Sequence, residues 1–272
     1  NWLKLKNITS LHNNVRLFRN QQNIGMTPNW NKTIEYARGT WLSFICDDDI
    51  YKEDAFSRIR TLIKDITTPC LILQSFEIET ATEWFEKGSE TARNTTLPPA
   101  SGQFWHKEIT DKVGGFDVRI KYCPDYEFWL RMAYHYPVLK IKDFFVFPNQ
   151  HDENYMWEIF RKPDLLENVA FSIKIGSKYT LGKDYDNPSI LENNINDGLW
   201  ETLRTIINNG FLHKNKMDIF NKYIIEFIRF SFKMKRKTRM IKVLLRLILY
   251  RFYQPLRPSV KKIKLFMVNL RA

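Results

Sequence analysis

Three consecutive aspartates, Asp47, Asp48 and Asp49, directly follow an apolar run early in the sequence. The run, residues 41–46, has the length and composition of a buried strand, and Gly39 precedes it. Adjacent carboxylates repel one another, and a cation between them makes a partly buried position tolerable. Ligands of open α/β sheets bind beyond the carboxyl ends of the strands, so the triplet predicts a site for a divalent metal that carries phosphates. The alternative is a solvated acidic turn before the next helix, and the triplet alone does not decide between the two.

Short motifs stand on both sides of the triplet in a fixed order. Upstream are Asn23-Ile24-Gly25, then Asn31, then Ala37-Arg38-Gly39. Downstream are Gly114-Gly115-Phe116-Asp117 and a segment from Asp125 that reads Asp-Tyr-Glu-Phe-Trp-Leu-Arg. In order, gaps and residue types, the series resembles the nucleotide-sugar glycosyltransferases of family two, which have the GT-A fold, over residues 14–151. Each motif is weak by itself, whereas the ordered set is fairly specific.

The secondary-structure signals agree with an α/β fold followed by a helical region. We expect strands at residues 15–19, 41–46, 70–73, 138–141 and 144–147. We expect helices at residues 27–37, 52–64 and 125–135, a short helix that ends at residues 111–115, and mostly helix from residue 153 onward. Residues 79–100 are polar and are expected to be irregular. The resemblance implies a Rossmann-like GT-A domain with a mixed, mostly parallel sheet and flanking helices.

Three segments are expected: a catalytic domain at residues 1–155, a helical appendage at 156–226 and a basic tail at 227–272. Family members open with a strand, a helix and a second strand that hold the nucleotide. Because residues 15–18 resemble the strand after these elements, the resemblance implies that a βαβ unit of about 30 residues is missing before them. A complete small protein with a divergent start is the alternative.

The cysteines Cys46, Cys70 and Cys123 are odd in number and lack metal-site spacing, which favours a reducing compartment over a disulfide framework or a zinc site. No apolar stretch approaches the length of a membrane span.

The net charge of +12 belongs to the tail. Residues 227–272 contain fourteen Lys or Arg and no Asp or Glu, while the rest of the chain holds twenty-eight basic and thirty acidic residues. Basic residues recur at helical spacing among apolar ones, at Arg236, Arg239, Lys242 and Arg246. This pattern suits the anionic surface of a membrane, which we favour because a glycan-building enzyme meets lipid-linked acceptors there. RNA is a second partner of suitable chemistry, and a helix that packs on the domain with its charges in solvent is the third interpretation.

Glycosyl transfer needs a cation to neutralise the departing diphosphate. By resemblance, Asp49 binds Mg²⁺ or Mn²⁺ directly, and Asp47 or Asp48 contacts the donor's ribose or a metal-bound water. Asn31 matches the family's donor-site asparagine. His151 matches a histidine that lies near the diphosphate or the metal in relatives, and a plain surface histidine is the alternative.

The acceptor hydroxyl needs a general base, and by resemblance this is Asp125. The residue begins a helix, whose N-terminus stabilises the ionised form, and a simple helix cap is the alternative. Many relatives have Glu where this chain has Pro124, which puts the acceptor pocket in doubt. Glu127 and Arg131 lie four residues apart on the same helix and are expected to pair as structural supports.

These observations favour a metal-dependent, inverting glycosyltransferase of surface polysaccharide or glycoconjugate assembly, at the cytoplasmic face of the cell membrane. A nucleotidyl or phosphoryl transferase would favour a Gly-rich phosphate loop, which the sequence lacks. A nucleic-acid or membrane-binding protein without catalysis, and an inactive glycosyltransferase fragment, remain as alternatives.

Overall fold

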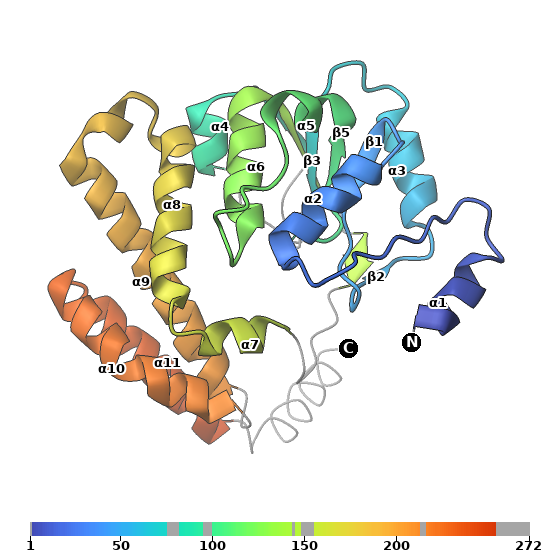
Figure 1. Cartoon of the computed structure of the whole chain (residues 1–272). Coiled ribbons are helices and arrows are strands. Elements are labelled where there is room, and N and C mark those ends of the chain that lie inside the picture. The colour runs from blue at the N-terminus through green and yellow to red at the C-terminus, as the bar shows by residue number, and fades with distance from the viewer. Residues whose placement is uncertain are drawn as a thin grey trace, which may run out of the picture.

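The computed structural model describes residues 2–74, 82–94, 100–142, 145–147, 155–212 and 216–253. A mixed sheet with flanking helices is followed by a region of packed helices (Figure 1). The strands are β1 (Trp41–Ser43), β2 (Ile50–Tyr51), β3 (Leu71–Gln74), β4 (Glu83–Phe85), β5 (Phe104–His106), β6 (Val138–Ile141) and β7 (Val146–Phe147). The helices are α1 (Trp2–Thr9), α2 (Met26–Tyr36), α3 (Ala55–Ile63), α4 (Ser89–Asn94), α5 (Lys107–Val113), α6 (Pro124–His135), α7 (Tyr155–Arg161), α8 (Leu165–Leu181), the 3₁₀ turn η1 (Gly182–Asp186), α9 (Pro188–Leu212), α10 (Met217–Lys233) and α11 (Lys237–Tyr253).

The main sheet has five strands in the order β1-β5-β3-β6-β4. Only β3 and β6 pair in parallel, whereas β1–β5, β3–β5 and β4–β6 are antiparallel. The α/β class and the helical C-terminal region are confirmed, but the expectation of a mostly parallel sheet is wrong. The reason is β5, which inserts between β1 and β3 and runs against both. The strands β1, β3 and β6 still share one direction, so their carboxyl ends meet at one edge of the sheet.

The central strand β3 is buried on both faces, as its continuous apolar run predicts. Leu71 and Leu73 belong to a core cluster with α6, while Ile72 belongs to a second cluster with α3 on the other face. This alternation follows from the two-residue period of a strand. The core on the α6 side is aromatic, with Trp105, Phe116, Phe128 and Trp129 in ring contact.

Two segment predictions are wrong. Residues 15–19 form no strand, because no neighbouring strand pairs with them: Val15 and Phe18 are exposed, and Phe18 stacks on Tyr36 instead. The segment 79–100, expected to be irregular, contains β4 and α4. Both elements are short and depend on tertiary partners, since β4 pairs with β6 and α4 packs on α6 and α8.

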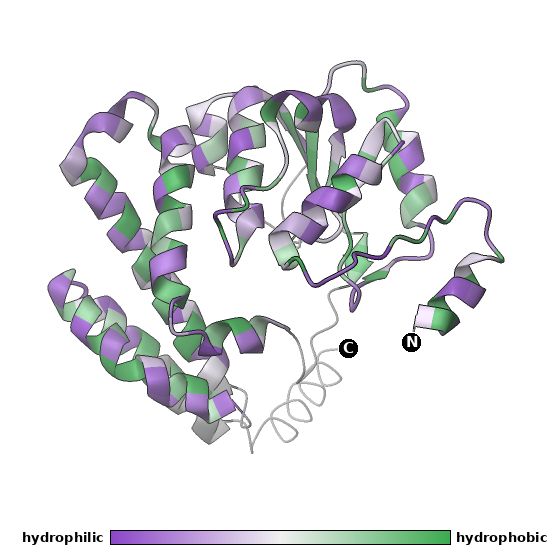
Figure 2. Ribbon diagram, in the orientation of Figure 1, coloured by the Kyte–Doolittle hydropathy of each residue, from purple (hydrophilic) through white to green (hydrophobic). Residues whose placement is uncertain are grey.

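The helices after residue 155 have their own core, which explains how so long a segment without strands holds together. Trp200 on α9 lies at its centre, with its indole N–H donating to Ser231 Oγ of α10 at 2.9 Å. Figure 2 shows hydrophobic and hydrophilic residues alternating along α8, α10 and α11, which is typical of helices with one packed side. The helix α10 runs continuously through residue 226, where one segment boundary was expected. Among the helices described, none is long and apolar enough to cross a bilayer.

A buried ion pair fixes α6 to the rest of the sheet-containing part of the chain. Arg131 Nε donates to Glu127 Oε1 at 2.8 Å, so the pairing expected from their spacing is confirmed. Glu127 is 1% exposed. The same guanidinium donates to the carbonyls of Val113, Gly114 and Gly115. The arginine therefore joins α6 to the glycine turn that ends α5.

We expect Glu127→Gln to lower the free energy of unfolding by roughly 3–5 kcal/mol, because it leaves the Arg131 charge buried without its counter-charge. The matched control is Asp218→Asn, which breaks the exposed pair with Arg161 at the same 2.8 Å separation. That substitution should cost at most about 1 kcal/mol. Urea unfolding of both variants measures the difference, and equal losses would contradict the central role of the buried pair.

Candidate functional site

The aspartate triplet lies at the edge of the sheet where β1, β3 and β6 end, as the sequence predicts. Asp47 is exposed, while Asp48 and Asp49 are partly buried. The Cys46 sulfur and one carboxylate oxygen each of Asp48 and Asp49 lie within 4.8 Å of one another. Two converging carboxylates are a suitable start for a hard divalent cation, whereas a thiol is a soft ligand that Mg²⁺ and Mn²⁺ do not favour. The geometry thus groups Asp48 with Asp49 and leaves Asp47 outside the cluster.

The segment 100–103 holds this acidic turn in place. The backbone N–H of Cys46 donates to Ser101 Oγ at 2.9 Å, and that of Gly102 donates to the Phe44 carbonyl at 2.8 Å. Gly102 has a φ of 83°, and a side chain there would collide with Gln74 and Val146. The close approach of the two segments therefore depends on glycine at this position.

A buried amide network supports the same segment from behind. Gln74, at the end of β3, donates from Nε2 to the Ser101 carbonyl at 3.1 Å. Its backbone N–H donates to Gln103 Oε1 at 3.0 Å, and its Oε1 accepts from the Phe145 N–H at 2.5 Å. Sequence reasoning missed both glutamines, although a polar residue that closes the apolar run 70–73 was a signal for Gln74.

Asp125 lies on the first turn of α6 and is connected through Ala100 to the segment 100–103, which binds the acidic turn. Its carboxylate accepts backbone N–H groups of Ala100 and Tyr126. Burial raises the pKa of Asp125 to about 6, although these hydrogen bonds lower it. The carboxylate thus does bind N–H groups of its own helix, as a capping residue would. It also retains a proton affinity suited to a base near neutral pH.

The carboxylates of this region raise the pKa values of two nearby thiols. Burial, followed by the charges of Asp49, Asp48 and Asp125, raises the pKa of Cys46 to about 11, although a hydrogen bond with Ser101 lowers it. Burial and the charge of Asp125 raise the pKa of Cys123 to about 12. The charges of the acidic turn and of Asp125 therefore act on the same thiol, Cys46.

The helical region fixes the approach to Asp125. Asn168 Oδ1 on α8 accepts the backbone N–H groups of Lys121 and Tyr122, at 3.1 and 3.0 Å. Asp164, which precedes α8, accepts from the Tyr122 hydroxyl at 2.8 Å. The chain then turns through Cys123, whose φ of 53° is left-handed, into α6. Sequence reasoning missed Asn168 and Asp164, because nothing in their spacing connects them with a segment more than forty residues away.

Asn31 connects two segments of the sheet-containing part of the chain. Its Nδ2 donates to the Phe116 carbonyl at 2.9 Å, and its Oδ1 accepts the Phe116 N–H at 2.7 Å. Both ends of the amide thus bind the turn after Gly115, so the side chain joins α2 to that turn. A donor contact for Asn31 stays a prediction. His151 lies outside the described residues.

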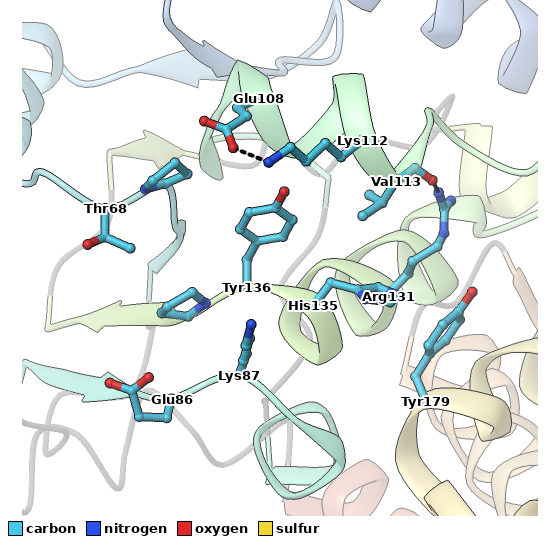
Figure 3. Close-up of a pocket in the computed structure, with 12 residues that line it drawn as sticks. Thr68, Glu86, Lys87, Glu108, Lys112, Val113, Arg131, His135, Tyr136 and Tyr179 are labelled. Carbon is cyan, nitrogen blue, oxygen red and sulfur yellow. Dashed lines mark hydrogen bonds and ion pairs between the residues drawn. The ribbon is translucent and has the colours of Figure 1, made fainter.

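A cavity of about 800 Å³ lies at the opposite end of α6 (Figure 3). His135 and Tyr136 line it, together with the Glu108–Lys112 ion pair. Burial and the charges of Arg131, Lys87 and Lys178 lower the pKa of His135. Ten residues of helix separate His135 from Asp125, about 15 Å, so this cavity is separate from the acidic turn.

Comparison with known families gives a match over the first part of the chain. The family model described as glycosyl transferase family 2 matches residues 4–122. Residues 4–122 are a glycosyl transferase family 2 domain. This range contains Asn31, the aspartate triplet and the glycine turn, and it ends three residues before Asp125.

Two solved structures are distantly similar to this chain. A crystal structure of S. aureus TarS 1-349 matches with a TM-score of 0.46 at 12% identity, covering 86% of this chain and 78% of that chain. A crystal structure of S. aureus TarS matches with a TM-score of 0.42 at 13% identity, covering 83% of this chain and 46% of that chain. Comparison with curated proteins gives no match.

We expect Asp49→Asn to weaken Mn²⁺ binding at least about tenfold, since even the loss of a group that only supports a ligand costs this much. Asp47→Asn is the matched control, because its carboxylate lies outside the 4.8 Å cluster. Electron paramagnetic resonance of free Mn²⁺ measures both affinities without an acceptor or donor. If only the Asp47 variant lost Mn²⁺ affinity, the assignment of the metal to Asp49 would be wrong.

Proposed function

We propose that the chain transfers a sugar from a nucleotide-sugar donor to an acceptor hydroxyl, with inversion at the anomeric carbon. The observation that carries the proposal is the grouping of Asp48 and Asp49 within the family 2 match, with Asp125 joined to the same acidic turn through residues 100–101. Asp48 and Asp49 would hold Mg²⁺ or Mn²⁺. Such an ion, when bound, would neutralise the charge that develops on the departing diphosphate.

The chain's own residues divide the remaining work. Asp125, once ionised, accepts the proton of the acceptor hydroxyl as the new bond forms. A single base that acts on the face opposite the leaving group inverts the anomeric centre. Asn31 and Asp47 are proposed donor contacts, as is His151 near the diphosphate or the metal. The domain limits at residues 155 and 226 are part of the same proposal.

We expect Asp125→Asn to lower the transfer rate at least about a hundredfold with donor affinity largely kept. Asparagine has almost the same shape, and its oxygen can still accept an N–H group, so the fold should persist. The rate of the unsubstituted protein should fall as the pH drops through about 6, because the proton then occupies the base. The measurement is nucleoside diphosphate release from a panel of nucleotide sugars with Mn²⁺, over a pH series.

Two results would overturn this assignment. Lost donor affinity with an unchanged rate at saturation would make Asp125 a binding or capping residue. If no nucleotide sugar is turned over at any pH while Mn²⁺ and a nucleoside diphosphate bind, the protein is an inactive member of its family.

We further propose that α10 and α11 bring the protein to an anionic membrane, at the cytoplasmic face, where it builds surface polysaccharide or glycoconjugate. Exposed apolar side chains alternate with cations on these helices: Phe232, Ile241 and Leu245 are each about half exposed, and Lys237 lies 4.7 Å from the Phe232 ring centroid. Such a surface suits anionic headgroups above an apolar boundary. Residues 254–272, the rest of the expected tail, lie outside the described residues.

Part of the tail has a packing role. Arg236 binds Asp197 and lies over the Trp200 ring at 5.1 Å, and Met240 and Leu247 are buried. Deleting the tail would therefore damage the helical core. Charge reversal at exposed positions is the cleaner test.

We expect the triple variant Lys237→Glu, Arg239→Glu and Lys242→Glu to lose binding to phosphatidylserine-containing vesicles by about a hundredfold or more, at roughly 1 kcal/mol for each basic residue. The control variant carries the same charge change on other exposed lysines, Lys174, Lys178 and Lys183. Co-sedimentation at low and high salt measures both. Equal losses in the two variants, or equal binding to neutral vesicles, would contradict the docking surface.

A further inference from the structure

A second cavity, of about 810 Å³, lies between the sheet-containing part of the chain and the helical region. Its walls come from α4, α6, α7, α8 and α9; α8 contacts each of the other four and lies between α6 and α9 in Figure 1. The volume falls within the range of small-molecule sites, which is about 300–1,000 Å³. The apolar residues that line it are Ala92, Leu130, Met156, Phe160, Val169, Ile173, Leu181 and Ile206.

Several polar residues of the lining are already engaged with the protein. Arg93 donates to the Thr180 carbonyl at 2.9 Å, Asn194 donates to Ser177 Oγ at 2.8 Å, and Thr202 donates to the Gly198 carbonyl at 2.9 Å. Ser172 differs, because it is 3% exposed and its hydroxyl has no partner among the described residues. Glu201 and Arg204, which also line the cavity, form an ion pair with each other, and Glu201 and Thr205 are exposed at its rim. The buried part of the lining is therefore mostly carbon surface with the Ser172 hydroxyl, which suits a hydrocarbon chain with few polar atoms.

The first turn of α6 connects the cavity with the proposed base. Cys123 and Tyr126 both line the cavity, and Asp125 lies between them in the chain. A ligand in the cavity thus contacts residues on both sides of Asp125 in the chain.

We propose that this cavity binds a single alkyl or isoprenoid chain of the acceptor, with the acceptor's sugar directed toward Asp125. This inference rests on the proposed function, since it names the class of acceptor: an amphipathic glycoside and not a free, fully polar sugar. Burying the chain supplies binding free energy far from the reacting hydroxyl, which holds that hydroxyl near the base.

The test is a chain-length series of n-alkyl β-D-glucosides, from methyl to octyl, below their micelle concentrations. Saturation-transfer NMR and calorimetry on the full chain measure binding without metal or donor. The affinity should rise with each methylene, by up to about fourfold, until the cavity is filled. Because neither metal nor nucleotide is present, a negative result here is independent of the turnover assay that tests the transfer reaction.

Filling the cavity should abolish the chain-length dependence. Val169→Trp adds bulk on the cavity side of α8, and Lys174→Trp adds the same side chain at an exposed position of the same helix as the matched control. We expect octyl glucoside to bind at least about tenfold more weakly to the first variant and unchanged to the second. Circular dichroism checks the fold, and Thr202→Phe on α9 replaces Val169→Trp if that variant does not fold.

Four outcomes would overturn the proposal. Equal affinity for methyl and octyl glucosides would show that no chain is bound. Equal octyl glucoside affinity in the filled and control variants would put the chain elsewhere, such as on α10 and α11. Tighter binding of octanol than of octyl glucoside would indicate a free lipid site that excludes the sugar. If deletion of residues 254–272 increased the affinity for octyl glucoside, the cavity would be a site for the chain's own tail, which competes with the glucoside.

Discussion

The position of the proposed base depends on the buried pair of Glu127 and Arg131. A charged pair in the core is expensive unless every hydrogen-bonding group is satisfied, and here the guanidinium also binds three consecutive carbonyls at the glycine turn. The next residue of that turn, Phe116, is held by Asn31. One ion pair thus joins α6, the end of α5 and α2 into a unit. Asp125 lies at the N-terminal end of that unit.

Two opposing influences set the proton affinity of Asp125. The helix N-terminus and the N–H groups of Ala100 and Tyr126 stabilise the carboxylate, which was the effect expected from the sequence. Burial works in the other direction and is the larger effect, since the pKa rises to about 6. A carboxylate with this pKa is ionised in most molecules at neutral pH and is more basic than an ordinary aspartate. Both properties suit a base that takes a proton during bond formation.

The parts of the site that follow local rules could be predicted from the sequence. The run 41–46 with its aspartates, the helix at Asp125 and the spacing of Glu127 and Arg131 each depend on neighbours within one strand or two helical turns. The prediction failed where distant segments decide. Residues 15–19 have strand-like composition but no strand to pair with, and β4 forms only because β6 is beside it. The antiparallel β5 likewise lies between β1 and β3 through contacts that span more than thirty residues.

The helical region is part of the site for a physical reason. A short connection that enters a helix through a left-handed residue, such as Cys123, needs outside support to stay in one conformation. Asn168 supplies it by accepting both N–H groups of Lys121 and Tyr122, and Asp164 adds the Tyr122 hydroxyl. The same helix, α8, then continues as a wall of the apolar cavity behind Cys123 and Tyr126. Any shift of α8 must therefore move the base and the cavity together. For this reason the geometry of Asp125 is a property of the joined domain and helical region, and the family 2 segment alone does not determine it.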